Sequence, residues 1–137
     1  MHYSIHEVSS RTGLSAHTLR YYEKEGILTN IHRTAGGIRY YTDADMETLL
    51  LVRCLKETGM PLSEIAVFIR LTCQGDLSLQ IRCDILRRHR ENILEQIRQT
   101  QQHLERITRK LAYFSEQERL YAAKKEAETQ KHSLDLE

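Results

Sequence analysis

Residues 17–28 read HTLRYYEKEGIL, and this stretch predicts one short helix with two different sides. Leu19 and Tyr22 lie three residues apart, so helical spacing puts both on one face, whereas Tyr21 points about 100° away from Tyr22 and cannot share that face. Gly26 can take the left-handed conformation that ends a helix. We therefore expect Tyr22 to pack inside the protein and Tyr21 to face a partner outside the chain.

A second helix is expected immediately before this one. Ser4 and Glu7 have the spacing of a capping box, in which each side chain bonds the backbone N–H of the other residue. Residues 12–14, Thr-Gly-Leu, break that helix, and Ser15 caps the next one, which should run over residues 16 to about 25. Two short helices joined by a tight turn that contains Gly are typical of a helix-turn-helix.

The next segment predicts a small hairpin and two more helices. Residues 31–41 hold two short apolar and basic runs around the glycine-rich tip 34–37, which is a hairpin pattern. Two strands alone are marginally stable, so the hairpin must lean on the helices. A third helix opens at Thr42, with acidic residues in its first turn, and closes at Gly59; a fourth should cover about residues 62–70.

A long apolar seam follows these elements. From Leu79 onward, apolar residues recur at alternating steps of four and three, with no Gly or Pro to interrupt them. Such a seam is typical of a coiled coil, here roughly 60 Å long at 1.5 Å per residue, and it predicts a second copy of the chain, although a single solvated helix is the alternative. The predicted dimer contacts are Leu86, Ile93, Ile97, Leu104, Ile107, Leu111 and Phe114.

Length and composition restrict the kinds of protein that this chain can be. With 137 residues, 40% hydrophobic and 28% charged, it is about one domain, and we expect no separate catalytic domain, no membrane span and a cytoplasmic location. Its net charge of +1 would not by itself suggest nucleic acid. Cys54, Cys73 and Cys83 form no C-x-x-C pair, so we expect reduced thiols, no metal and no cofactor. No nucleophile and base are paired, and we expect no enzymatic activity.

The order of these parts resembles the MerR family of bacterial transcription regulators. The likeness covers about residues 1–121, and its most specific stretches are 18–23 with 26–28, TLRYYE and GIL, and 37–41, GIRYY. The resemblance implies a mainly α fold, in which a winged helix-turn-helix head is followed by a long dimerisation helix that forms an antiparallel coiled coil. It divides the chain into a DNA-binding domain (1–71), a linker (72–78) and the dimerisation helix (79–122), and the polar sequence that follows predicts a disordered tail (123–137).

The resemblance also assigns DNA contacts to the second helix. Its N-terminal half would enter the major groove of double-stranded promoter DNA, where His17 and Thr18 can reach base edges. Arg20 and Tyr21, one turn further on, suit the phosphates beside the groove. An ion pair between Arg20 and Glu23, or a packed surface position for Tyr21, is the structural alternative.

In the wing and the third helix, the resemblance implies further contacts with the DNA backbone. Arg39 and Tyr40 would reach the flanking backbone or the minor groove, and Gly37 lets the tip approach closely, while Lys56 matches a phosphate-contacting position. Members of this family bind as dimers to pseudo-palindromes and deform promoters so that RNA polymerase can engage them. A coiled-coil adaptor, whose helical head binds a protein instead, is the alternative from another functional class.

The resemblance also suggests an inducing signal. The chain resembles the short branch of the family that responds to aldehydes and other electrophiles through one cysteine in the third helix, and Cys54 stands at the matching place. Arg53 and Lys56 could favour its reactive thiolate, whereas the apolar residues Leu50 and Leu51, one turn earlier, would disfavour it by burial. An inert, packed thiol and a non-thiol ligand both remain open.

Overall fold

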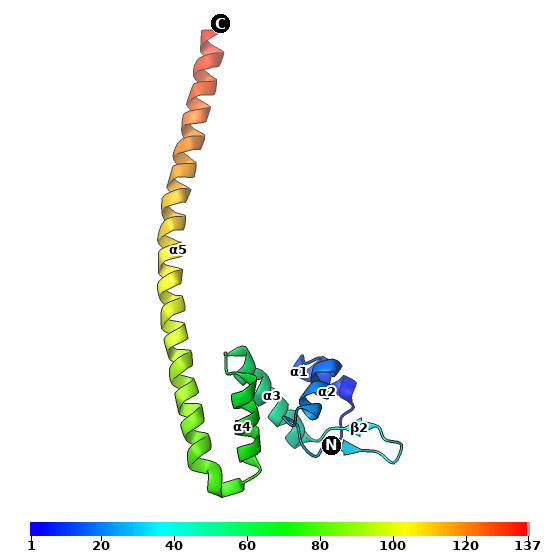
Figure 1. Ribbon diagram of the computed structural model, residues 1–137. Helices are drawn as coiled ribbons and strands as arrows, with labels where there is room; N and C mark the ends of the chain where they lie inside the picture. Colours follow the sequence, from blue (N-terminus) through cyan, green and yellow to red (C-terminus); the bar gives the residue numbers. More distant parts are fainter. Residues whose placement is uncertain (137) are drawn as a thin grey trace. The chain divides into compact units, whose positions relative to one another are not determined.

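The computed structural model describes residues 1–136 and is mostly helical, as the sequence predicts (Figure 1). The chain forms two compact units, one from Met1 to Glu91 and one from Asn92 onward. Its elements, in chain order, are α1 (Ile5–Thr12), α2 (Ala16–Lys24), β1 (His32–Arg33), β2 (Arg39–Tyr40), α3 (Asp43–Glu57), α4 (Leu62–Thr72), the 3-10 turn η1 (Gly75–Ser78) and α5 (Leu79–Asp135). The helix-turn-helix, the hairpin and the long C-terminal helix are therefore all present.

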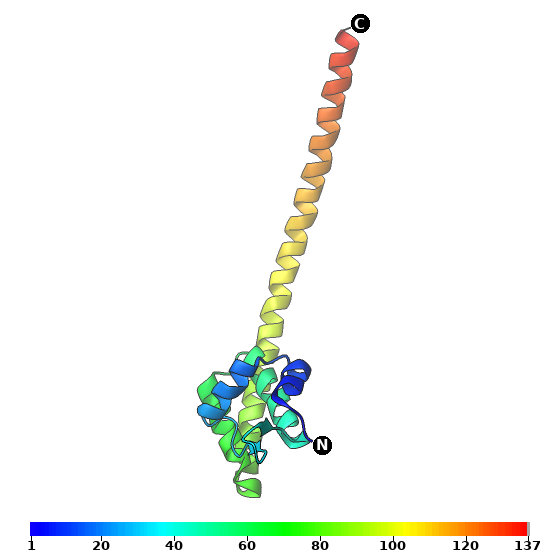
Figure 2. The same ribbon diagram turned by 90° about the vertical axis from the view of Figure 1, so that its right-hand side faces the viewer.

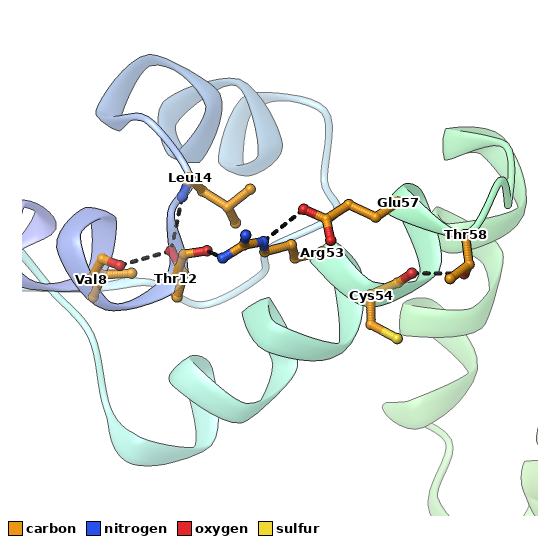
Figure 3. Close-up of polar contacts among 7 residues, drawn as sticks. All are labelled: Val8, Thr12, Leu14, Arg53, Cys54, Glu57 and Thr58. Atoms are coloured by element: carbon orange, nitrogen blue, oxygen red, sulfur yellow. Dashed lines mark hydrogen bonds and ion pairs between the residues drawn. The ribbon is translucent and has the colours of Figure 1, made fainter. Parts of the chain in front are cut away.

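Thr12 fixes the turn between α1 and α2. Its hydroxyl donates to the Val8 carbonyl at 2.7 Å and accepts from the Leu14 N–H at 3.2 Å (Figure 3). Gly13 follows with φ at 75°, a left-handed conformation that favours glycine. Ser15 then caps α2 by accepting a backbone N–H of its first turn at 3.1 Å. These local bonds set the direction in which α2 leaves the turn.

The capping box occurs at a different helix from the one predicted. At α1, the structure shows the first of the two expected bonds, from the Glu7 N–H to Ser4 Oγ at 3.1 Å. The reciprocal pair is found at α3, where the Asp45 N–H donates to Thr42 Oγ1 at 3.2 Å and the Thr42 N–H donates to Asp45 Oδ2 at 2.9 Å. An aspartate therefore completes this box in place of the usual glutamate or glutamine.

The core of the first unit takes apolar side chains from all four of its shorter helices. Leu19 and Tyr22 of α2 are buried, with 0% and 1% of their surface exposed. They belong to one cluster with Val8 of α1, Leu49 of α3 and Ile65 of α4. The inward face predicted for α2 is confirmed, and this packing leaves the opposite side of α2 exposed in a fixed orientation.

The hairpin is short and depends on its neighbours. Its strands β1 and β2 have two residues each, too few for stability in isolation. The base is tied to the N-terminal segment, because Tyr3 and Tyr41 exchange two backbone hydrogen bonds of 2.8 Å. Gly37 at the tip has φ at 82°, so the glycine serves the backbone conformation of the turn.

The first turns of α5 belong to the first unit, which extends to Glu91 and not only to residue 71. His89 is 8% exposed, and its Nε2 lies 2.7 Å from Thr58 Oγ1. The Thr58 hydroxyl also donates to the Cys54 carbonyl at 2.7 Å. One hydroxyl therefore connects the end of α3 to α5 across 31 residues of sequence.

The structure differs from the disordered tail predicted for residues 123–137. α5 continues through Asp135 as one helix (Figures 1 and 2), and Glu137 lies outside the described residues. The physical reason is that this segment consists mainly of Lys, Glu, Ala and Gln, which are good helix formers, with no Gly or Pro. Among residues 1–136, no helix combines the length and hydrophobicity needed to cross a membrane.

Candidate nucleic-acid interface

The N-terminal half of α2 presents two side chains that can form hydrogen bonds outward. His17 is exposed and Thr18 is half-buried in the first turn. Ser15 Oγ donates to Thr18 Oγ1 at 2.9 Å, so the Thr18 hydroxyl keeps its own proton for another acceptor. This arrangement is compatible with the base-edge contacts predicted for both residues.

One turn further along α2, the two adjacent tyrosines separate as predicted. Tyr21 is 43% exposed, whereas Tyr22 is 1% exposed. Arg20 is also exposed, on the side of α2 that the core leaves uncovered. The alternative partner for Arg20, the Glu23 carboxylate, instead accepts bonds from two arginines of the hairpin, described next.

Glu23 connects the last turn of α2 to both strands of the hairpin. Arg39 Nε donates to Glu23 Oε2 at 2.6 Å, and Arg33 Nη2 donates to Glu23 Oε1 at 3.2 Å. Arg33 Nη1 also donates to the Gly37 carbonyl at the tip, at 3.1 Å. Arg39, predicted to contact DNA, is thus held on Glu23 with its side chain 28% exposed, and Arg33, which sequence reasoning left out, shares that carboxylate.

The register of the hairpin explains this arrangement. Arg33 pairs with Arg39, and His32 pairs with Tyr40, so each pair occupies one face because side chains alternate along a strand. The arginine face meets α2. On the other face the rings of Tyr40 and His32 stack with their centroids 5.2 Å apart, and the His2 ring lies 4.6 Å from Tyr40. Two residues predicted to act together, Arg39 and Tyr40, therefore lie on opposite faces.

A buried tyrosine and a lysine extend the polar region around α2. Lys56 of α3 places its Nζ 5.8 Å from the centroid of the Tyr22 ring, which brings a cation from α3 to α2. The Tyr22 and Tyr41 hydroxyls are buried and have no hydrogen-bond partner among residues 1–136. Burial raises the pKa of the Tyr41 phenol above its ordinary value, and the Glu23 carboxylate raises it further, while nearby arginines act in the opposite direction. The phenol therefore remains neutral near Glu23.

Cys54 is exposed on α3, and the two cations expected beside it are engaged elsewhere. The Arg53 guanidinium donates to the Thr12 carbonyl and, through Nε, to Glu57 Oε1 at 2.8 Å (Figure 3). Lys56 lies over the Tyr22 ring. The thiol is accessible in this chain, so packing within the chain does not make it inert. Within residues 1–136, no cluster of three His, Cys, Asp or Glu side chains could hold a metal ion.

Comparisons with known proteins also indicate that this surface belongs to a DNA-binding protein. Residues 3–71 match the family described as "MerR HTH family regulatory protein", and residues 46–110 match "MerR, DNA binding". An uncharacterised HTH-type transcriptional regulator of Haemophilus influenzae is 36% identical over 90% of this chain and 92% of its own length. The HTH-type transcriptional regulator AdhR of Bacillus subtilis is 30% identical over 67% of this chain and 66% of its own length.

Solved structures of transcription regulators also resemble this chain. The crystal structure of HiNmlR, a MerR family regulator lacking the sensor domain, bound to promoter DNA, is 37% identical, with a TM-score of 0.72 over 77% of this chain and 80% of that one. A MerR family transcriptional regulator from Bacillus thuringiensis is 31% identical, with a TM-score of 0.75 over 82% of this chain and 98% of that one. The winged helix-turn-helix and the long helix are thus shared with DNA-binding regulators.

Proposed function

This chain belongs to the MerR family of helix-turn-helix regulatory proteins, and from that premise we propose that it acts as a homodimer on a pseudo-palindromic operator in the cytoplasm. It is a DNA-binding transcription regulator. The observation that carries the proposal is the exposed side of α2, where Arg20 and Tyr21 follow His17 and Thr18 on a helix whose other side is fixed in the core.

We assign different tasks to the residues of this surface. His17 and Thr18 read base edges in the major groove, because they lie in the first turn of the recognition helix. Arg20, Tyr21 and Lys56 bind phosphates beside the groove, because a guanidinium, a phenol and an ammonium are donors that suit phosphate oxygens. Tyr40 and the tip at Gly37 reach the flanking backbone from the wing. Arg39 can contact the flanking DNA backbone only through an N–H group that is not bonded to Glu23.

A mobility shift on the promoters of its own and neighbouring operons tests DNA binding. Arg20→Ala should weaken binding to all sequences by a similar factor and reduce the salt slope by about 1, whereas His17→Ala should change which operator variants are preferred. Arg109→Ala, on α5, controls for the loss of one positive charge. Equal affinity of Arg20→Ala and the parent would contradict the phosphate contact, and no retarded complex on any such promoter would favour a protein-binding adaptor.

The proposed dimer rests on the apolar seam of α5. Ile97, Leu104, Ile107, Leu111 and Phe114 are each more than half exposed in the single chain, and a stripe of this kind is expected to be covered by a second helix. Leu86 and Ile93 continue the seam at its N-terminal end. An antiparallel pair would place the two heads at opposite ends of the coiled coil, as two half-sites on DNA require.

Two charges on the seam should separate the protomers. Ile97→Asp with Leu104→Asp places carboxylates in the centre of the interface, and sedimentation should then show monomers where the parent is a dimer. Gln99→Asp with Gln102→Asp adds the same charge at positions off the seam and should leave the dimer intact. Dimers in the first variant would place the interface elsewhere on the chain.

We further propose that the dimer activates transcription by bending and untwisting the operator so that RNA polymerase engages both promoter elements. Operator DNA carried in circularly permuted fragments should then migrate differently according to the position of the site. In vitro transcription with purified polymerase should rise with the regulator on the promoter with native element spacing, whereas a promoter with a shortened spacer should already be active without the regulator and gain little from it. Activation that does not depend on spacer length would contradict deformation as the mechanism.

Cys54 is the proposed site of induction by an aldehyde or an oxidant. Its exposure supports this role, since a reacting thiol must be accessible. Cys54→Ser should bind the operator normally and fail to respond to a small aldehyde, while Cys73→Ser and Cys83→Ser should respond like the parent. A retained response in Cys54→Ser would move induction to another cysteine or to a non-thiol ligand, and DNA binding would be unaffected by that result.

A further inference from the structure

We propose that Glu23 is a positioning residue, which fixes the wing hairpin against α2 and thereby increases the preference for the operator over other DNA, without touching the DNA itself. The inference rests on the proposed DNA-binding function. It concerns how the two parts of the interface, the recognition helix and the wing, keep one relative orientation.

The geometry singles out this carboxylate. Glu23 lies in the last turn of α2, its side chain is 24% exposed, and its two oxygens accept from Arg39 at 2.6 Å and from Arg33 at 3.2 Å. Each arginine comes from a different strand, 16 and 10 residues away in sequence. One side chain of the recognition helix therefore holds both strands, and charged, partly buried bonds of this kind are stronger than neutral ones.

The other attachments of the hairpin lie at its base, where Tyr41 is buried in the same apolar cluster as Leu19 and Tyr22 of α2. Its base is tied to the N-terminal segment by Tyr3 and Tyr41, which fixes where the hairpin starts but not the angle at which its tip leaves. Tyr41 is buried beside Glu23, yet its hydroxyl has no hydrogen-bond partner in the described residues 1–136. Within the part of the chain that the structure describes, the ion pairs, and no phenol bond, are thus the polar link between α2 and the two strands.

An acidic side chain at this place is otherwise unfavourable for DNA binding. A carboxylate near phosphates repels them, and Glu23 also occupies guanidinium groups that phosphates could use. Glu23 must therefore favour operator binding by fixing the orientation of the wing before the protein meets the DNA. A wing that is already oriented pays less entropy when it docks in the operator complex, whereas a non-specific complex, which depends on charge alone, gains nothing from that order.

The test compares Glu23→Gln with Glu25→Gln in the full chain. Glu25 is the exposed C-cap residue of α2, so its variant removes the same charge two residues away. Dissociation constants are measured for the operator and for a scrambled duplex at several salt concentrations. Glu25→Gln should tighten binding to both by the same factor. Glu23→Gln should tighten binding to the scrambled duplex and lower the operator preference about tenfold, within the range of one lost base contact.

A double-mutant cycle identifies the partner through which Glu23 acts. Arg33→Gln with Arg39→Gln, taken together as one member of the cycle, should lower the operator preference, and adding Glu23→Gln should lower it no further, because these two arginines are the partners through which Glu23 acts. Additive losses would contradict the inference, as would an unchanged preference in Glu23→Gln. A parent protein that retards no promoter fragment would instead contradict the proposed function on which this inference rests.

Hydrogen exchange of the free protein gives a readout without DNA. The hairpin closes through the bond from the Thr34 N–H to the Ile38 carbonyl, at 2.8 Å. Glu23→Gln should speed exchange of the Thr34 amide, while amides of α1 and α3 keep their parent rates and Glu25→Gln changes neither. Equal acceleration in all elements would show a general loss of stability and would overturn the positioning role.

Discussion

Gly13→Ala should destabilise the head more than the same change at Gly26, although both glycines have nearly the same backbone conformation. Their φ angles are +75° and +76°. A Cβ at Gly26 would meet nothing within 4 Å, whereas a Cβ at Gly13 would lie 2.6 Å from Arg53 Nη1. The pair therefore separates backbone strain, which both variants share, from displacement of a side chain, which only Gly13→Ala causes.

The magnitudes follow from these two contributions. A left-handed alanine costs about 1–2 kcal/mol, partly offset because alanine also restricts the unfolded chain. The Arg53 guanidinium is the flexible end of its side chain, so it gives way and loses its bond to the Thr12 carbonyl (Figure 3). A bond to a charged group contributes about 1.5–3 kcal/mol, and the lower end applies because Arg53 is 41% exposed. We expect about 1 kcal/mol for Gly26→Ala and about 2–3 kcal/mol for Gly13→Ala.

The assay is urea unfolding followed by the near-ultraviolet tyrosine signal, with Tyr113 and Tyr121 of α5 replaced by Phe in every variant so that the remaining tyrosines report the head and not the long helix. Protein concentration is held constant because dimerisation contributes to stability. In an Arg53→Ala background, Gly13→Ala should cost the same as Gly26→Ala, since the displaced bond is already absent. Equal costs for the two glycines in the parent, or an excess cost at Gly13 that survives Arg53→Ala, would refute this reasoning.

Two further stability predictions concern polar contacts of the first unit. The hydrogen bond from Tyr3 lowers the pKa of Asp43 below its usual 3.8. This bond therefore stabilises the fold at neutral pH, and the stabilisation is lost as the pH falls through the lowered pKa. The urea midpoint of Tyr3→Phe should consequently fall less between pH 7 and pH 3 than that of the parent. Thr58→Val leaves the buried His89 without the hydroxyl at 2.7 Å and should cost about 1–3 kcal/mol in the same urea assay. Thr129→Val, which removes an exposed hydroxyl that donates to the Lys125 carbonyl of its own helix, should cost less than half as much.

The elements of the fold were predictable because each has a local signal. The three-residue spacing of Leu19 and Tyr22 gave the inner face of α2, and both are buried. The glycine-rich tip indicated the hairpin, and the long seam indicated α5. The end of α5 was predicted wrongly, because the polar residues after Ala123 were interpreted as disorder although most of them favour a helix.

The contacts that organise the interface were not predictable in the same way. Glu23 binds Arg33 and Arg39 across 10 and 16 residues, and that pairing depends on the angle between the hairpin and α2, which no local pattern specifies. The pairing of Arg33 with Arg39 in the hairpin register was the one available signal. Applied to the predicted hairpin, it would have placed Tyr40 on the face opposite Arg39.

The expectation that Arg53 and Lys56 lie beside the Cys54 thiol also failed, because closeness in sequence does not show where side chains on a helix point. Arg53 is rotated by about 100° from Cys54 on α3, and Lys56 by about 200°, so both point away from the thiol. The structure engages them with the Thr12 carbonyl and the Tyr22 ring. Activation of the thiol by adjacent cations therefore has no support from this chain, and a role for Cys54 in sensing must rest on its accessibility and position.

That position matters because the end of α3 bonds to two other elements. Arg53 holds the turn between α1 and α2 through the Thr12 carbonyl, and Thr58 bonds the Cys54 carbonyl (Figure 3). Thr58 also bonds His89 of α5. A group added at Cys54 would thus lie between the contact that orients the helix-turn-helix and the contact that orients the first turns of α5. A signal at the thiol can reach the DNA-reading helix only by changing one of these bonds or the packing around them, since a ligand shifts an equilibrium only through contacts that differ between its two states.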